Sequence, residues 1–414
     1  MTRPALAALA VLLLGCGQPQ GTGPNKHVSS DMPAKTAPEP APTPAPEPEG
    51  PPVRKDGTIY AETQQMGTRV SINVHVGERK PAEAGAAIEA AFAEIERIEQ
   101  IMSEWRPSSE LSQLNDGAGG PLRPLSAELF EVLQRSKEIA QATGGAFDPT
   151  FYGVGQLWKY DPGSRPPTRE AILEKLPLVD WRSIELDATT RSGRLAKPGM
   201  KMGLGAIAKG YAVDRASTVL RERGFTDHIV EGGGDTFVSG TKGGKTWMVG
   251  IQRPDGPGSV AAIPARDRAV VTSGDYQRFI EFEGVRYSHI LDPRTGFPVP
   301  EQRSLQSITI LAPNATEADA YATAVAVLGA DAGFEFIQSH PGLDAALITH
   351  SGELRVTPEL AKILVYPQDK QPAPSPPAPS QPAPSQPAPS PPAPSPPAPS
   401  PPAPSLPAPS LPAP

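Results

Sequence analysis

The 414-residue chain is poor in cysteine, in aromatic residues and in clustered positive charge. It has one cysteine, which excludes an internal disulfide, and aromatic residues make up 6% of the sequence. Its apolar block at residues 5–14 is too short to cross a bilayer of about 30 Å as a helix. The net charge is −7 and no run of lysine and arginine occurs. We therefore expect no nucleic-acid-binding surface, and a small molecule or a protein as the partner.

The single cysteine completes a pattern typical of bacterial lipoprotein signals. The apolar block ends in Leu13-Leu14-Gly15-Cys16, which has the form of a lipobox. This predicts a cleaved signal peptide at residues 1–15 and a lipid on the Cys16 thiol, with a buried or reactive free thiol as the alternative. No aspartate follows the cysteine to signal retention at an inner membrane, and which membrane holds the anchor stays open. We expect the body to lie outside the cytoplasm, lipid-anchored on the periplasmic face of the cell envelope.

Proline accounts for 54 residues, and most of its excess lies near the two ends. Residues 16–55 read as a lipidated tether, because few of them could build a core. Residues 367–414 repeat a Pro-Ala-Pro-Ser unit and should form polyproline II of about 3.1 Å per residue. This tail is either a plain spacer or a segment that crosses wall polymer or binds an aromatic groove. Residues 56–366 remain as the folded body, enough for one large or two fused lobes.

Hydrophobic periodicity in the body predicts helices and strands in separate groups. Strand alternation is clear at residues 68–76, and the apolar spacing of residues 86–102 is helical. Helices cluster early and strands in the middle, which favours an α+β fold. The further helices are expected at 125–143, 206–224 and 316–328, and the further strands at 228–230, 247–251, 269–272, 279–282, 307–311 and 345–349.

Two segments of the chain resemble nucleotide-binding loops. Residues 203–208 match G-x-G-x-x-A before a helix, but the preceding segment is not a β-branched strand, so a Rossmann site is disfavoured. Residues 239–246 resemble a Walker A loop, yet the first glycine is Ser239 and a strand follows in place of a helix. We interpret this second segment as a hairpin turn.

The stretch His289-Ile290-Leu291-Asp292-Pro293-Arg294-Thr295-Gly296 places two ionisable groups around a turn that carries a cation. Such a cluster can bind and activate a phosphate ester, which makes His289 and Asp292 the catalytic candidates. His289 is the first candidate for a general base or a charge stabiliser. The alternative is an ordinary turn with a packed histidine.

Two positions elsewhere are suited to phosphate and metal binding. Lys209 falls in the first turn of a helix, where a cation opposes the helix dipole, so either ligand contact or simple solvation explains it. Asp319 and Thr323 stand four apart on a predicted helix and project from one face, an arrangement suited to an oxygen-ligated ion. Aspartate near a helix start is more often only a cap, so the pair is a weak signal alone.

These segments together resemble the ApbE family of FAD:protein FMN transferases. The resemblance rests on the stretch at residues 289–296 and on Gly144-Gly145-Ala146-Phe147-Asp148-Pro149, residues 205–211 (GAIAKGY) and residues 318–323 (ADAYAT). It runs from about Met66 to Gly329 in the family's order. Gly233-Gly234-Asp235 and Ser273-Gly274-Asp275 also resemble loops of the family, with no role assigned to each. Alone, the glycines and proline at 144–149 would need only a Schellman stop and a turn.

The resemblance implies a fold, a ligand and a metal. The fold is a two-lobed, T-fold-related body with mixed or antiparallel sheets and packed helices. Mg²⁺ is implied on Asp319, Thr323 and the backbone carbonyl of Ala206. FAD is implied as the substrate, in contact with Met66, Trp105, Ala146, Phe147, Asp148, Lys209, His289 and Ile290.

The implied reaction transfers FMN from FAD to a threonine of a membrane flavoprotein subunit and releases AMP. One departure is Gly203, where the family usually has an aspartate that contacts the nucleotide. This departure supports one alternative, an envelope FAD carrier without turnover. If water replaces threonine, the same site gives the other alternative, an FAD pyrophosphatase that yields FMN and AMP.

Overall fold

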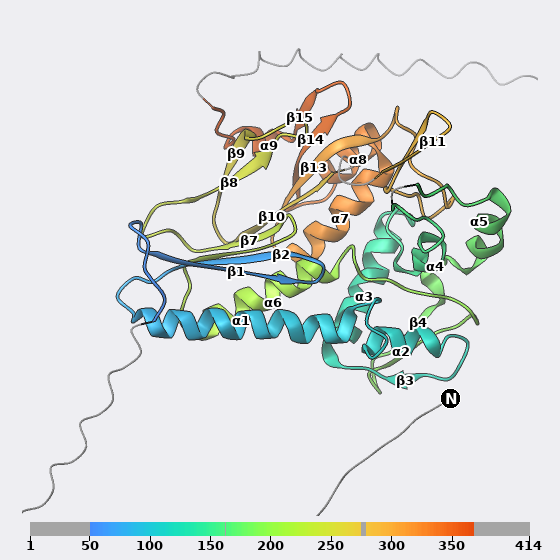
Figure 1. Cartoon of the computed structure of the whole chain (residues 1–414), viewed down its shortest axis with the longest axis horizontal. Coiled ribbons are helices and arrows are strands. Elements are labelled where there is room, and N and C mark those ends of the chain that lie inside the picture. Colours follow the sequence, from blue (N-terminus) through green and yellow to red (C-terminus); the bar gives the residue numbers. More distant parts are fainter. Residues whose placement is uncertain (1–49, 162, 275–278, 368–414) are drawn as a thin grey trace, which may run out of the picture. The chain divides into compact units, whose positions relative to one another are not determined.

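The computed structural model describes residues 50–161, 163–274 and 279–367. The predicted signal peptide, Cys16, nearly all of the tether and the proline-rich tail lie outside these ranges. The main element is an eight-stranded sheet in the order β1-β2-β6-β7-β10-β13-β14-β15, in which every neighbouring pair is antiparallel (Figure 1). Its strands are β1 (Thr58–Gln65), β2 (Thr68–His75), β6 (His228–Gly232), β7 (Asp235–Ser239), β10 (Arg268–Gly274), β13 (Leu305–Ala312), β14 (Asp344–Thr349) and β15 (Leu354–Val356).

Three long helices pack against this sheet: α1 (Pro81–Met102), α6 (Ala208–Glu222) and α7 (Ala315–Leu328). In α1 the buried side chains recur every three or four residues, from Ala84 through Ile95 to Met102, as a helix lying on a sheet requires. Helix α7 is alanine-rich and buries most of its surface. α8 (Ala330–Gln338) follows it and packs against β14.

Helices α6 and α7 approach each other unusually closely at Gly210. A Cβ on Gly210 would lie 2.1 Å from the backbone oxygen of Ala315, so no larger residue fits without moving a helix. Asp214, one turn further along α6, accepts hydrogen bonds from the backbone N–H groups of Ala315 (2.9 Å) and Thr316 (2.9 Å) at the start of α7. These contacts fix the two helices that carry Lys209 and Asp319.

The other elements are short, except for the 16-residue helix α3 (Ala127–Ala142). The short helices are α2 (Glu110–Asp116), α4 (Tyr152–Gly155), α5 (Arg169–Lys175) and α9 (Pro358–Ala361), with 3-10 turns η1 (Pro149–Phe151), η2 (Leu176–Leu178) and η3 (Trp181–Ser183). The small sheets are β3 (Arg123–Pro124), β5 (Ser192–Leu195) and β4 (Ile184–Asp187); β8 (Trp247–Gln252) and β9 (Ser259–Ala265); and β11 (Phe279–Phe282) and β12 (Val285–Ser288). A separate apolar cluster around Val154, Trp158 and Ile280 joins α4 to the β11–β12 hairpin.

The α+β prediction is confirmed, and the predicted helices and strands are present with shifted ends. The predicted hairpin turn is also correct, because Lys242 and Lys245 exchange backbone hydrogen bonds across Gly243 and Gly244. The helices α2, α4, α5, α8 and α9 and the strands β1, β3, β4, β5, β7, β9, β12 and β15 were not predicted. In the large sheet, β1 is rich in polar residues, and β7 is five residues long and follows a glycine turn directly. None of the helices in the described ranges is long and apolar enough to cross a membrane.

Candidate functional site

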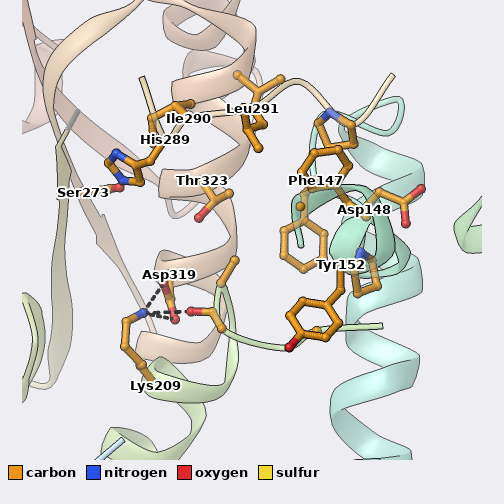
Figure 2. Close-up of a pocket in the computed structure, with 18 of the residues that line it drawn as sticks. Phe147, Asp148, Tyr152, Lys209, Ser273, His289, Ile290, Leu291, Asp319 and Thr323 are labelled. Atoms are coloured by element: carbon orange, nitrogen blue, oxygen red, sulfur yellow. Dashed lines mark hydrogen bonds and ion pairs between the residues drawn. The ribbon is translucent and has the colours of Figure 1, made fainter. Parts of the chain in front are cut away.

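A cavity of about 480 Å³ lies between two unlike walls. On one side stand Lys209, Asp235, Asp319 and Thr323, which come from α6, β7 and α7 and which we call the charged wall. On the other side stand Phe147, Phe151 and Tyr152, which follow α3 and which we call the aromatic wall. Figure 2 shows Phe147 and Tyr152 facing Lys209, Asp319 and Thr323 across the pocket.

Lys209 organises the charged wall. Its Nζ lies 2.9 Å from both carboxylate oxygens of Asp319 and 3.0 Å from Oδ2 of Asp235, and it also donates to the Gly205 carbonyl at 3.3 Å (Figure 2). The side chains of Asp235 and Asp319 are buried. Lys209 lies in the first turn of α6, where the helix dipole disfavours a positive charge. The two carboxylates offset this unfavourable interaction.

The charges of this wall are not balanced. Burial opposes the charge of Lys209, but Asp235 and Asp319 outweigh it and raise its pKa, so the ammonium stays protonated. Burial, and then repulsion from Asp319, raise the pKa of the Asp235 carboxyl well above its usual range. Although Asp235 Oδ2 lies 3.0 Å from Lys209 Nζ, no donor meets hydrogen-bond geometry at this buried oxygen. Two carboxylates therefore face one cation, and one acceptor is unused.

The charged wall fits a hard divalent cation by the chemistry of its donors. Asp319 and Thr323 stand one turn apart on α7, and both line the cavity together with Ala206. A carboxylate, a hydroxyl and a backbone carbonyl are the oxygen ligands that Mg²⁺ prefers. Within the described ranges no group of three or more His, Cys, Asp or Glu residues could hold a metal ion. A cation here would need water or phosphate oxygens to complete its shell, as Mg²⁺ sites commonly do.

The His289–Gly296 turn closes one end of the cavity through His289, Ile290, Leu291 and Pro293. Figure 2 shows His289 beside Ser273 and near Thr323. Asp292 does not line the cavity. Its carboxylate is buried and accepts hydrogen bonds from Nε (2.8 Å), Nη2 (2.7 Å) and the backbone N–H (3.0 Å) of Arg294. This geometry favours an orienting role for Asp292, which fixes the turn that presents His289.

The aromatic wall begins where α3 stops. Gly145 donates to the Ala140 carbonyl (2.8 Å) and Gly144 to that of Gln141 (3.2 Å), and both glycines have positive φ, so the predicted Schellman stop is present. Ala146, Phe147 and Asp148 then enter the cavity.

Asp148 is largely engaged by its own neighbours. Its carboxylate accepts from the N–H (2.9 Å) and hydroxyl (2.6 Å) of Thr150 and from the N–H of Trp181 (3.1 Å). Burial raises its pKa, while these hydrogen bonds oppose the increase. Asp148 therefore holds the loop in shape as well as lining the cavity.

Trp105 stands at the rim of the aromatic wall. Its ring meets that of Tyr152 edge to face, with centroids 6.0 Å apart, and the residue is 76% exposed. An exposed indole beside a cavity offers a face on which a planar ring can stack.

Most of the predicted site residues meet in this one cavity. Ala146, Phe147, Asp148, Ala206, Lys209, His289, Ile290, Asp319 and Thr323 all line it. Met66, Trp105 and Asp292 are not among its lining residues. Met66 has positive φ, its N–H donates to Glu99, and with Lys209 it borders a separate small hollow behind the charged wall.

Sequence reasoning missed Glu104, Tyr152 and the role of Asp235. Gly233-Gly234-Asp235 matched a loop of the family, but nothing in its spacing shows that Asp235 would meet Lys209. Ser273 and Gly274, which also matched a family loop without a role, line the cavity, whereas the neighbouring Asp275 lies outside the described residues.

Comparison with known proteins agrees with this geometry. Residues 66–347 match the model of the ApbE family. The chain is 36% identical over 310 residues to the FAD:protein FMN transferase of Treponema pallidum, covering 70% of this chain and 84% of that protein. It is 29% identical over 362 residues to the Escherichia coli K12 protein of the same name, covering 85% and 93%. The crystal structure of the ApbE protein of Thermotoga maritima superposes with a TM-score of 0.68 at 31% identity, covering 74% of this chain and 99% of that one.

Proposed function

The chain belongs to the ApbE family, and from that premise we propose that it transfers the FMN portion of FAD to a threonine hydroxyl of a partner flavoprotein. AMP is the other product. The observation that carries this proposal is the pairing of the two walls in one cavity. The aromatic wall suits a planar ring, and the charged wall offers a buried cation and hard oxygen donors of the kind that bind a pyrophosphate.

The charged wall would hold Mg²⁺ through Asp319, Thr323 and the Ala206 carbonyl. When bound there, Mg²⁺ would neutralise charge on the pyrophosphate oxygens. Asp319 also pairs with Lys209, so the lysine ammonium lies next to the proposed metal ligand. From there it can neutralise charge on the same pyrophosphate oxygens. Phosphoryl-type transfer depends mainly on positioning and charge neutralisation, so this small set of groups is sufficient.

The transfer step exchanges one P–O bond for another. The threonine hydroxyl of the acceptor attacks the FMN-side phosphorus, a bond forms between its oxygen and that phosphorus, and the bond to the AMP phosphate oxygen breaks. The proton of the threonine must leave, and His289 at the cavity wall is our candidate to accept it or to stabilise the developing charge. Asp292, held to Arg294, acts as a positioning residue for the turn that carries His289.

The proposal is tested by incubating the protein with FAD, Mg²⁺ and a threonine-bearing acceptor peptide, and by measuring both AMP and the mass of the peptide. A peptide heavier by one FMN, formed together with AMP, supports transferase activity. AMP and free FMN in equal amounts, with or without the peptide, would instead identify an FAD pyrophosphatase. Bound FAD with no AMP would identify a carrier and would contradict the proposal.

We also propose that the enzyme acts at the envelope, anchored by a lipid on Cys16. Support comes from the lipobox Leu13-Leu14-Gly15-Cys16 after an apolar block. An acceptor on a membrane flavoprotein subunit would then lie within reach of the tethered body. Labelling of cells with a palmitate analogue should mark the wild-type protein and not Cys16→Ala. Equal labelling of both, or Cys16→Ala remaining in washed membranes, would contradict the lipid anchor.

A further inference from the structure

Glu104 is a cavity-lining carboxylate that the proposed reaction does not use. It lies in the turn after α1, next to Trp105, and it borders the cavity together with Tyr152 and Gly205. Its own backbone N–H and that of Leu204 favour the ionised form of its side chain. Lys209 acts on it through space, but no ion pair joins it to a lysine or arginine in the part of the chain that the structure describes.

Gly205 leaves space for this carboxylate to approach the chain closely. Glu104 Oε1 lies 3.3 Å from the point where a Cβ on Gly205 would stand, so the carboxylate rests against the Gly203–Gly205 segment. The space beside Gly203 is filled by the Tyr152 side chain, whose atoms lie 3.0–3.2 Å from the corresponding Cβ point. A side chain at position 203 would require Tyr152 to shift by a few tenths of an ångström. The carboxylate that reaches this segment is that of Glu104.

Glu104 has acceptor capacity for a ligand. Burial raises its pKa, and the N–H of Leu204 and the charge of Lys209 oppose that increase. A carboxylate in this position repels phosphate oxygens and binds hydrogen-bond donors. In a dinucleotide the neutral groups rich in donors are sugar hydroxyls, which occur in the ribose of the adenosine half and in the ribityl chain of the flavin half.

We propose that Glu104 is a specificity residue that accepts hydrogen bonds from the sugar hydroxyls of the bound dinucleotide. This rests on the proposed function for the identity of the ligand. Glu104 also discriminates against ligands in which a further phosphate occupies the same place.

The test is FAD binding by the full chain, followed through the quenching of flavin fluorescence. Glu104→Gln keeps the size of the side chain and removes its charge, and it should weaken FAD binding about 10-fold, as expected for a lost charge-assisted hydrogen bond. Glu96→Gln is the matched control, because Glu96 lies on α1, pairs with Arg106 and is not among the residues that line the cavity. The control should bind FAD as the wild type does.

Two pairs of half-ligands decide which sugar is involved. Riboflavin is compared with lumiflavin, which lacks the ribityl chain, and ADP with 2′,3′-dideoxy-ADP, which lacks the ribose hydroxyls. Glu104→Gln should weaken the hydroxylated member of one pair and leave its partner unchanged. A loss for riboflavin assigns Glu104 to the ribityl chain, and a loss for ADP assigns it to the ribose.

Two results would overturn this inference. Wild-type FAD affinity in Glu104→Gln would show that the carboxylate makes no contact with the ligand. Equal losses for both members of each pair would show that Glu104 only shapes the Leu204 loop. The outcome is independent of turnover: if the wild type binds FAD without transferring FMN, the proposed function fails while these binding comparisons still decide the role of Glu104.

Discussion

The two walls of the cavity differ in how they are built. Lys209, Asp235 and Asp319 come from three regular elements of the sheet and helix layers, their side chains are largely buried, and they bind one another at about 3 Å. The aromatic wall comes from a helix stop and a short helix, and Trp105 at its rim is 76% exposed. Charges must be held by a rigid frame because misplaced buried charge is costly. A ring needs only a face to stack on.

Removal of the cation from the charged wall should have the largest effect on the protein. Lys209→Met leaves Asp235 and Asp319 buried without compensation, which should lower the free energy of unfolding by about 3–5 kcal/mol. Mg²⁺ should restore part of that loss, because it can replace the missing charge. Thermal and denaturant unfolding with and without Mg²⁺ measure both effects.

Lys197→Met is the control for this variant, because Lys197 pairs with Asp180 in a more exposed setting. It should change stability by about 1 kcal/mol or less. If Lys209→Met were as stable as this control, the charged wall would not be a mutually dependent unit.

Asp319→Asn tests the chemistry assigned to the charged wall. It removes the carboxylate that pairs with Lys209 and that is proposed to bind the metal, so AMP release from FAD should fall on the order of 100- to 1000-fold. Asp331→Asn on α8, where the side chain is exposed and pairs with Arg355, should keep full activity. Substantial AMP release by Asp319→Asn that still depends on Mg²⁺ would place the metal elsewhere.

Gly210→Ala tests whether the charged wall depends on the close approach of α6 and α7. The added Cβ would meet the Ala315 backbone oxygen, so the helices must separate, at a cost of about 2–3 kcal/mol. Gly256→Ala is the control, because the corresponding Cβ there has no neighbour within 4 Å. Equal melting temperatures for the two variants would mean that α6 and α7 can accommodate the added methyl group without strain.

His228 gives the frame behind the charged wall a dependence on pH. Its ring contacts Ser217 on α6 (2.8 Å) and the Phe225 carbonyl (2.8 Å), and burial lowers its pKa to about 4. The unfolded chain therefore binds a proton on His228 below about pH 6.5 that the folded chain does not. The contribution of neutral His228 to stability is complete above that pH and is lost as the pH falls towards 4. The loss amounts to about 2 kcal/mol at pH 5.

The difference in unfolding free energy between the wild type and His228→Gln isolates this contribution. Arg221 lowers the pKa of His228 further, whereas Asp227 and Asp267 oppose it. The difference should shrink by about 2 kcal/mol from pH 8 to pH 5. A difference that is constant over this range would show that His228 titrates normally.

The smallest effect is expected at the exposed rim. Trp105→Ala should weaken FAD binding by about 1 kcal/mol, roughly five-fold, because one stacking face is lost while the rest of the aromatic wall remains. Trp105→Phe should retain most of the affinity. Loss of turnover at saturating FAD in Trp105→Ala would mean that the rim takes part in the chemistry.

Sequence patterns predicted the main helices and strands better than the side-chain contacts between them. The apolar spacing of α1 and the β-branched run of β13 are strong local signals, and both elements were found close to their predicted positions. β1 escaped prediction because it is an edge strand whose residues are largely polar. Local preference decides such elements less than pairing with a neighbour does.

The motifs located the cavity, but tertiary contacts set the tasks of individual residues. Asp235 and Lys209 are distant in sequence, and only the pairing of β7 with β6 and β10 brings Asp235 beneath the start of α6. Asp292 looked available, yet Arg294 two residues later occupies its carboxylate. The sequence alone does not show that Arg294 binds this carboxylate, because that depends on the directions of the two side chains.

The most direct measurement of the central claim is a steady-state comparison of Asp319→Asn and Trp105→Ala, with FAD varied at saturating Mg²⁺ and acceptor peptide. If the charged wall performs the transfer and the aromatic wall holds the ring, kcat should collapse in Asp319→Asn. In Trp105→Ala, KM for FAD should rise several-fold while kcat stays near the wild-type value. Loss of kcat in Trp105→Ala together with wild-type kcat in Asp319→Asn would contradict this division of labour.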